Sequence, residues 1–146
     1  MIARIETELP TSAEQAWEAL LKRDTFLFIT RGVLGFRGAD QWPNAFHEGV
    51  EIETRLVFLH LIPAWKHTLR VVKVDEENLE LVSHETGGIV RRWNHRILLE
   101  SIGEERCRYL DEIDIDAGLP TPLVWVYAHL FYRYRQRRWR RLARTL

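Results

Sequence analysis

A long antiparallel meander between residues 50 and 116 constrains the fold of this chain more than any other feature. Five strand-like stretches follow one another, and a turn signal closes each of them. They are Val50–Ile62 before Pro63, Trp65–Val74 before the acidic turn 75–78, Leu79–Thr86 before Gly87-Gly88, Ile89–Ser101 before Gly103, and Arg106–Ala117 before Gly118. Because an open sheet of this size cannot bury its apolar face on itself, the pattern predicts that another element covers that face.

The C-terminal segment is the only other segment long enough to cover such a sheet. Thr121 is the expected N-cap of a long helix, and Pro122 suits the first helical position. The expected apolar face of this helix consists of Leu123, Tyr127, Leu130, Phe131, Tyr134 and Leu142. A curved sheet that grips one helix usually leaves a cavity between the two, and cavities of this type are ligand sites.

The N-terminal third of the chain predicts one more strand and two short helices. Residues 2–9 alternate between apolar and polar with the period of a half-buried strand. Thr11 and Glu14 have capping-box spacing for a first helix, Asp24 to Thr30 indicates a second, and 32–49 indicates a loop. The predicted fold class is therefore α+β: a curved antiparallel sheet of six or seven strands wrapped around a long C-terminal helix, with two short helices after strand 1. We expect residues 1–146 to form a single domain.

Composition narrows the class of protein. The 46% of hydrophobic and 29% of charged residues are typical of a globular protein rather than a disordered one. A single cysteine, Cys107, excludes an intramolecular disulfide framework and a cysteine-based zinc site. No apolar run approaches the roughly 20 residues of a membrane span, and the first ten residues lack the apolar core of a secretion signal. We therefore expect a cytoplasmic protein without a membrane span; its oligomeric state stays open, a homodimer included.

The net charge of zero hides an uneven distribution. Residues 121–146 contain seven arginines and no acidic residue, so residues 1–120 carry the opposite charge of −7. An arginine-rich helix can bind nucleic acid or an anionic membrane surface. We expect instead that Arg133–Arg144 binds no nucleic acid specifically. Arginine stems can cover apolar surface while their charged ends meet solvent or the acidic body of the domain.

Several stretches resemble the START-like, helix-grip superfamily, which includes polyketide cyclase/dehydrase-like and pollen-allergen-like proteins. The opening strand followed by TSAEQAWEAL is similar to the first strand and helix of that superfamily. HETGGIVRRWNHRI, YLDEIDIDAG and the terminal helix are similar to a bacterial branch whose members are mostly uncharacterised. The resemblance implies the fold but leaves the function open, since members bind lipids, sterols, hormones or polyketides and only some catalyse cyclisation or dehydration. No catalytic residue carries over, because the superfamily shares no catalytic motif.

Strand parity predicts which polar residues share the apolar face of the sheet. Around a loop centred on Gly103, a register in which facing residue numbers sum to about 206 places His95 opposite Asp111. A carboxylate beside an imidazole fixes the tautomer of the ring, which suits a general base or a ligand anchor. The alternative is a structural pair that closes one end of the sheet.

The same reasoning across the preceding turns predicts a second cluster. His67 falls opposite Glu85 across residues 75–78, and Glu85 falls opposite Arg91 across the glycine pair that follows it. A buried glutamate needs a partner, and arginine can bind both of its oxygens. Two interpretations stay open: one end of a pocket that recognises an anion or carboxylate, and a simple cross-strand salt bridge.

Aromatic residues complete the predicted site. Apolar walls, some with hydroxyl groups, are expected from Trp93 and Tyr109 on the strands and from Tyr127, Phe131 and Tyr134 on the terminal helix. The histidines match no metal-binding spacing, and no glycine-rich phosphate loop occurs, so neither a metal nor a cofactor is expected.

Two hypotheses of function follow. The leading one is binding of a hydrophobic small molecule of lipid, polyketide or aromatic type in an internal cavity, where His67, Glu85, His95 or Asp111 orients a hydroxyl, carbonyl or carboxylate. The alternative is a cofactor-independent cyclase or dehydratase that uses His95 and Asp111 as its acid/base pair.

Overall fold

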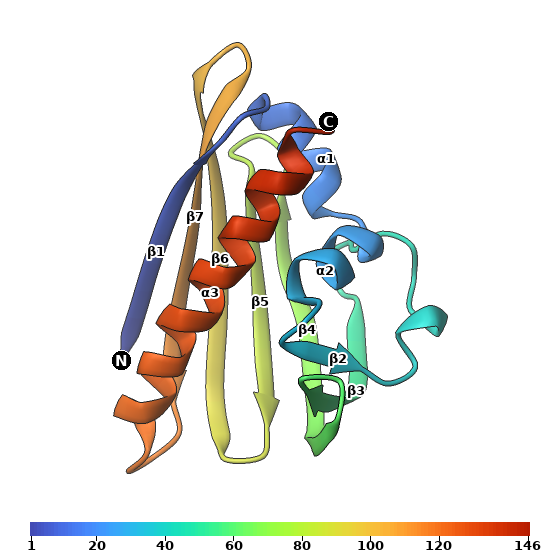
Figure 1. The fold of residues 1–146 in the computed structure, drawn as a ribbon, viewed down its shortest axis with the longest axis vertical. Coiled ribbons are helices and arrows are strands. Elements are labelled where there is room, and N and C mark those ends of the chain that lie inside the picture. Colours follow the sequence, from blue (N-terminus) through green and yellow to red (C-terminus); the bar gives the residue numbers. More distant parts are fainter.

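The computed structural model describes residues 1–146, which form seven strands and three α-helices (Figure 1). The strands are β1 (Ile2–Leu9), β2 (Leu34–Phe36), β3 (Glu51–Phe58), β4 (Ile62–Asp75), β5 (Glu80–Gly87), β6 (Val90–Gly103) and β7 (Arg106–Asp116). The helices are α1 (Ala13–Leu20), α2 (Arg23–Thr30) and α3 (Thr121–Ala143), with one short 3₁₀ helix, η1 (Ala39–Gln41). None of the helices is long and apolar enough to span a membrane.

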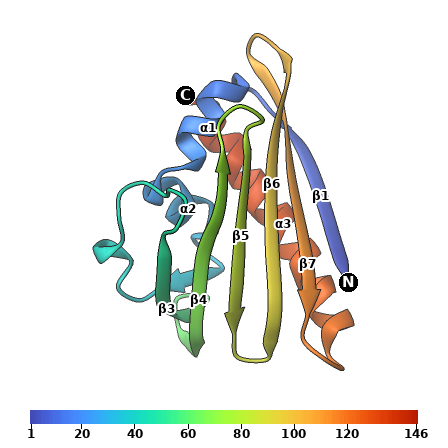
Figure 2. The same cartoon turned by 180° about the vertical axis from the view of Figure 1, so that it is seen from behind.

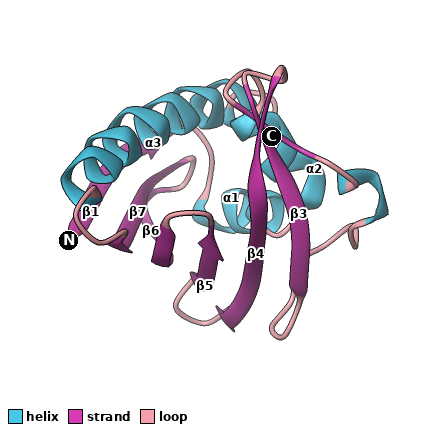
Figure 3. Ribbon diagram, turned by 90° about the horizontal axis from the view of Figure 1, so that it is seen from below, coloured by secondary structure: helices cyan, strands magenta, loops and turns pink.

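All seven strands form one antiparallel sheet in the order β1-β7-β6-β5-β4-β3-β2. The sheet curves around α3, as the view from below shows (Figure 3), and α3 crosses its concave side diagonally (Figure 1). Seen from behind, the strands lie in front of all three helices, so the convex face carries no helix (Figure 2). The predicted α+β architecture, with seven strands around α3 and two short helices after β1, is confirmed. The three-residue β2 lies inside the segment that was expected to be a loop.

The predicted pairing of the strands is wrong by two residues. His95 lies opposite Ile113 instead of Asp111, because the turn between β6 and β7 is centred after Glu104 rather than on Gly103. The same displacement places His67 opposite Gly87, and Glu85 opposite Leu69 and Trp93. Because side chains alternate with a period of two, a shift of two residues leaves every side chain on its predicted face. The residues expected to face each other are therefore diagonal neighbours on one face.

Three apolar clusters fill the space between the sheet and the helices, and the smallest consists of Phe46, Val50, Ile52, Leu69 and Val71. The first surrounds Trp139 and Ile97 beside α1, and the second surrounds Phe131 and Trp93 under the N-terminal half of α3. Polar side chains lie between these clusters on the inward faces of β5, β6, β7 and α3. This polar layer consists of Ser83, Glu85, His95, Asp111, Arg135 and Gln136.

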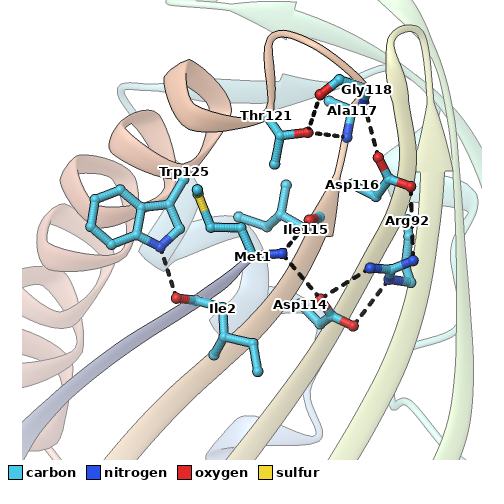
Figure 4. Close-up of polar contacts among 10 residues, drawn as sticks. All are labelled: Met1, Ile2, Arg92, Asp114, Ile115, Asp116, Ala117, Gly118, Thr121 and Trp125. Carbon is cyan, nitrogen blue, oxygen red and sulfur yellow. Dashed lines mark hydrogen bonds and ion pairs between the residues drawn. The ribbon is translucent and has the colours of Figure 1, made fainter.

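Hydrogen bonds hold the corner between β7 and α3 and connect it to β1 (Figure 4). Asp116 Oδ1 accepts from the backbone N–H of Gly118 at 2.9 Å, and Thr121 Oγ1 donates to the Gly118 carbonyl at 2.6 Å. Gly118 has a φ of 68°, which a residue with a side chain rarely adopts. Trp125 Nε1 donates to the Ile2 carbonyl at 2.7 Å. These contacts fix where α3 begins and hence the direction in which it crosses the sheet.

Both predicted N-caps are displaced by one residue. The N-cap of α1 is Ser12 rather than Thr11, because the Ser12 hydroxyl accepts from the backbone N–H of Gln15 at 3.1 Å. The N-cap of α3 is Pro120, so Thr121 is already helical. The Thr121 hydroxyl is engaged with the preceding turn instead of capping the helix.

The buried face of α3 is rotated from the predicted one. Leu123 and Leu130 were expected to be buried, but they are 74% and 65% exposed. The buried stripe consists of Ala128, Phe131, Tyr132, Arg135, Gln136, Trp139 and Ala143, a spacing of three and four residues. Arg135 is only 3% exposed, so it is an exception to the expectation that the charges of 133–144 largely meet solvent or the acidic body.

Candidate functional site

A cavity of about 360 Å³ lies between the concave face of the sheet, α3, α2 and the segment 34–42. Hydrophobic residues are 17 of the 23 that line it. Aromatic rings form much of the wall: Tyr127 and Phe131 stack with 5.6 Å between their centroids, and Phe26 and Phe36 approach to 5.0 Å. The volume falls in the range of roughly 300–1,000 Å³ that is typical of small-molecule sites.

Exposed apolar residues surround the end of the cavity at which α3 begins. Ile89 in the β5–β6 turn and Leu123 in the first turn of α3 both line the cavity and are 52% and 74% exposed. Trp65 packs over the same turn, so closely that a Cβ on Gly88 would lie 2.3 Å from the indole ring. The β5–β6 turn and the start of α3 both lie at the bottom of Figure 1. We call this end, marked by Ile89 and Leu123, the mouth of the cavity.

Four buried polar atoms on cavity-lining residues have no hydrogen-bond partner in the protein. They are Trp65 Nε1, His67 Nδ1, the Tyr127 hydroxyl and Arg135 Nε. Buried polar groups are nearly always hydrogen-bonded, so unpaired ones at a cavity wall indicate where a ligand or water supplies the partner. Burial raises the pKa of Tyr127 to about 12, so its hydroxyl stays neutral and can donate as well as accept.

Glu85 is the acidic group at the cavity wall. Its Oε2 accepts from His67 Nε2 at 2.8 Å, and its Oε1 accepts from the Ser83 hydroxyl at 3.1 Å. Burial acts to raise the pKa of Glu85, but the hydrogen bond and charge of His67, with smaller contributions from His95 and Ser83, lower it below its ordinary value. Glu85 is therefore an ionised carboxylate whose two oxygens each already accept a hydrogen bond from within the protein.

His95 and Asp111 meet within the polar layer. His95 Nε2 lies 2.7 Å from Asp111 Oδ1, and Asp111 also accepts from the Tyr109 hydroxyl at 3.2 Å and from Gln136 Nε2 at 3.0 Å. Because a carboxylate accepts and cannot donate, Nε2 of His95 donates here, which leaves Nδ1 facing the Tyr132 hydroxyl at 3.4 Å. Asp111 is fully buried and does not line the main cavity, while His95 lines an adjoining cavity of about 40 Å³ instead of the main one. The pair reaches the main cavity through Tyr132, which lines it.

Arg135 lines both the main cavity and the adjoining one. The centre of its guanidinium group lies 4.8 Å from the centroid of the Tyr132 ring and 5.9 Å from those of Phe26 and Phe131. These rings bind the cation through their faces, a favourable arrangement for arginine. The cavity thus combines apolar walls with one buried cation and one buried carboxylate.

No sequence-family model matches the chain, and no curated protein matches it in sequence. Solved structures are similar in fold. A START superfamily protein from Mycobacterium smegmatis has a TM-score of 0.73 at 12% identity, with 99% of this chain and 97% of that chain covered. The Zhui aromatase/cyclase from Streptomyces sp. R1128 has a TM-score of 0.71 at 12% identity, with 99% and 93% covered. Norcoclaurine synthase from Thalictrum flavum, in complex with dopamine and hydroxybenzaldehyde, has a TM-score of 0.55 at 15% identity, with 90% and 84% covered.

The chain has the START-like, helix-grip fold. In this START-like fold the cavity lies between the sheet and the helix that it grips. The cavity contains five of the predicted ligand-binding residues, which are His67, Glu85, Trp93, Tyr127 and Phe131.

Three predicted ligand-binding residues lie outside this cavity. Arg91 is exposed at the start of β6, and its guanidinium group lies beside Gly118, where a Cβ would come within 3.2 Å of it, instead of contacting Glu85. Tyr109 is fully buried behind the polar layer and packs on Trp139 with 5.3 Å between ring centroids. The Tyr134 hydroxyl donates to the backbone carbonyl of Arg31. These side chains support the START-like framework rather than line the cavity.

Arg135 and Tyr132 are two polar residues of the cavity wall that the sequence interpretation missed. Arg135 lies among seven arginines near the end of the chain, and the whole group was interpreted as a solvated face. The position of Arg135 in the sequence could have indicated its burial. Phe131, Arg135 and Trp139 follow one another at intervals of four residues, so they lie on one face of the helix. An arginine at the centre of an aromatic stripe indicates a buried position. No group of three or more His, Cys, Asp or Glu side chains is arranged to hold a metal ion.

Proposed function

We propose that this protein binds a hydrophobic small molecule of lipid, polyketide or aromatic type in the cavity between the sheet and α3. The observation that carries the proposal is the cavity itself, with its apolar walls and volume of about 360 Å³. The exposed Ile89 and Leu123 also support it, because they line the cavity at its mouth and offer an apolar molecule a hydrophobic entrance. Two solved neighbours support an aromatic occupant: an aromatase/cyclase, and a synthase crystallised with dopamine and hydroxybenzaldehyde.

The polar atoms of the cavity wall add a requirement for the ligand. The Tyr127 hydroxyl lies toward the mouth, where an alcohol or carbonyl on the ligand would pair with it. His67 and Glu85 form a bonded pair on the sheet side of the wall. An occupant with at least one hydroxyl, carbonyl or carboxylate fits this wall better than a plain hydrocarbon, since it relieves buried groups that lack partners.

A matched pair of variants on α3 tests the proposal. Val124 lines the cavity, whereas Val126 on the same turn is exposed and does not line it. N-phenyl-1-naphthylamine, a neutral probe that fluoresces in apolar surroundings, is expected to bind the wild-type protein. Val124→Trp fills the mouth and should weaken binding at least tenfold, roughly 1.4 kcal/mol, while Val126→Trp leaves it unchanged. Absence of probe binding to the wild type, or equal binding to both variants, would refute an internal binding site.

A second candidate function, a cofactor-independent cyclase or dehydratase, is favoured by the 2.7 Å contact between His95 and Asp111. In such an enzyme Asp111 orients His95, and His95 exchanges a proton with the substrate through the Tyr132 hydroxyl. Turnover of a poly-β-ketone thioester that is lost in His95→Gln, with N-phenyl-1-naphthylamine still bound, would support catalysis. Binding of such a thioester by the wild type without conversion would leave only the binding function.

A further inference from the structure

Arg135 is the only arginine or lysine among the buried residues. Burial of a cation is costly unless hydrogen bonds replace those that it made with water. Its neighbours Phe26, Phe131 and Tyr132 present ring faces, which attract the cation but do not satisfy its five N–H donors. Arg135 Nε accordingly has no hydrogen-bond partner. The interior therefore contains a donor group whose acceptor is not part of the fold.

The buried carboxylates of the polar layer do not supply that acceptor. Glu85 accepts from His67 and from a serine hydroxyl, and Asp111 accepts from His95, a tyrosine and a glutamine. The ion pairs of Glu85 and Asp111 are with these two imidazoles, at 2.8 and 2.7 Å, and neither carboxylate forms one with Arg135. Each carboxylate thus has its own imidazole, and the guanidinium group remains free for the cavity.

We propose that Arg135 binds the carboxylate of a hydrophobic monocarboxylic acid, an inference that rests on the binding function proposed above. A planar guanidinium group presents parallel N–H donors that match the two oxygens of a carboxylate. The surrounding aromatic rings exclude water, so the pairing would form at low dielectric, where charge-assisted hydrogen bonds are strong. Glu85 lines the same two cavities as Arg135, so its carboxylate would repel a second anionic group on the ligand. The ligand that fits is therefore an acid with one carboxylate.

The positions along α3 define the orientation of this acid. Leu123 marks the mouth, and Arg135 follows it by twelve residues, which is about 18 Å of helix at roughly 1.5 Å per residue. Tyr127 and Phe131 line the cavity between these two points. The carboxylate therefore lies at the inner end, beside the polar layer, and the apolar body extends toward the mouth.

A charged probe and a neutral probe of the same shape test the assignment. 2-Naphthoate and 2-acetylnaphthalene share a ring system and a carbonyl, but only the first is an anion at pH 7. Displacement of N-phenyl-1-naphthylamine is expected to show that the wild type binds 2-naphthoate at least about tenfold more tightly. Arg135→Met should remove this preference and leave binding of 2-acetylnaphthalene within about twofold of the wild type. Arg133→Met, an exposed arginine two residues earlier, is the matched control and should retain the preference.

Arg135→Lys provides a second variant that keeps the positive charge but loses the planar fork, and it should show an intermediate preference. Thermal unfolding of the ligand-free variants checks that they are folded. Equal wild-type affinity for the two naphthalenes, or a preference for 2-naphthoate that survives in Arg135→Met, would overturn the assignment. Failure of the wild type to bind N-phenyl-1-naphthylamine at all would instead overturn the proposed binding function.

Discussion

Replacement of Asp111 tests whether the polar layer is held together as the hydrogen bonds indicate. Asp111→Ala removes the acceptor for His95 Nε2, the Tyr109 hydroxyl and Gln136 Nε2, all in the interior. Each stranded donor costs about 1–3 kcal/mol, and removal of one partner of a buried ion pair costs about 3–5 kcal/mol. Since these losses overlap, we expect a total of about 3–5 kcal/mol in the free energy of unfolding.

Urea unfolding at pH 7, followed by tryptophan fluorescence and circular dichroism, measures this loss. Asp114→Asn is the matched control, because Asp114 lies on the same strand, pairs with Arg92 at 3.0 Å and is partly exposed. Such a surface pair contributes only about 0–1 kcal/mol. In thermal unfolding the two variants should differ by several degrees, at roughly 2–4 °C per kcal/mol for a chain of this size. A loss in Asp111→Ala no larger than in Asp114→Asn would refute the assigned network.

Three further outcomes are expected. The pKa of Glu85 lies below its ordinary value of 4.5, so Glu85 stabilises the fold above that pH and this contribution is lost as the pH falls through the folded-state pKa. A plot of Tm against pH should therefore fall more steeply in acid for the wild type than for Glu85→Gln. Burial raises the pKa of Cys107 to about 11, so a disulfide reagent at pH 8 should label Cys107 only after unfolding, and rapid labelling of the native protein would contradict this. Finally, Arg133–Arg144 should bind no duplex DNA in a low-salt gel shift; micromolar binding that weakens steeply with salt would show otherwise.

The element order and the facing of the strands could be predicted from the sequence, because both follow from periodicity. His95 and Asp111 were expected to meet, and they do, although the predicted register was two residues off. Register depends on the geometry of each turn, and the sequence does not reveal that the β6–β7 turn centres after Glu104. The error was harmless on one face of the sheet, since diagonal neighbours are still within reach of each other. Arg91 is the exception, because it has the same offset from Glu85 but its exposed side chain lies beside Gly118 instead.

The rotation of α3 could not be predicted from apolar residues alone. Leu123 and Leu130 are as hydrophobic as any residue of the buried stripe, yet both are exposed, because the sheet meets the helix along a different line. Ala128 and Ala143 lie on that line, and their small side chains allow close approach of the helix to the strands. Arg135 lies on the same line, so a charged guanidinium group occupies a core position of the helix.

The polar layer has a cost that the fold alone does not require. Apolar clusters lie on both sides of it, and a well-packed apolar layer of the same volume would be neutral or stabilising relative to buried charges. Removal of one partner of a buried ion pair is destabilising, as expected for Asp111→Ala. That loss shows that the remaining partner needs an acceptor, but not that the polar layer stabilises the fold more than an apolar layer would. What distinguishes the layer is its position, since Glu85 and Arg135 lie in it and also line the cavity. Arg135 has no acceptor within the fold, so its retention in the interior is best explained by a molecule that enters from the mouth and supplies one.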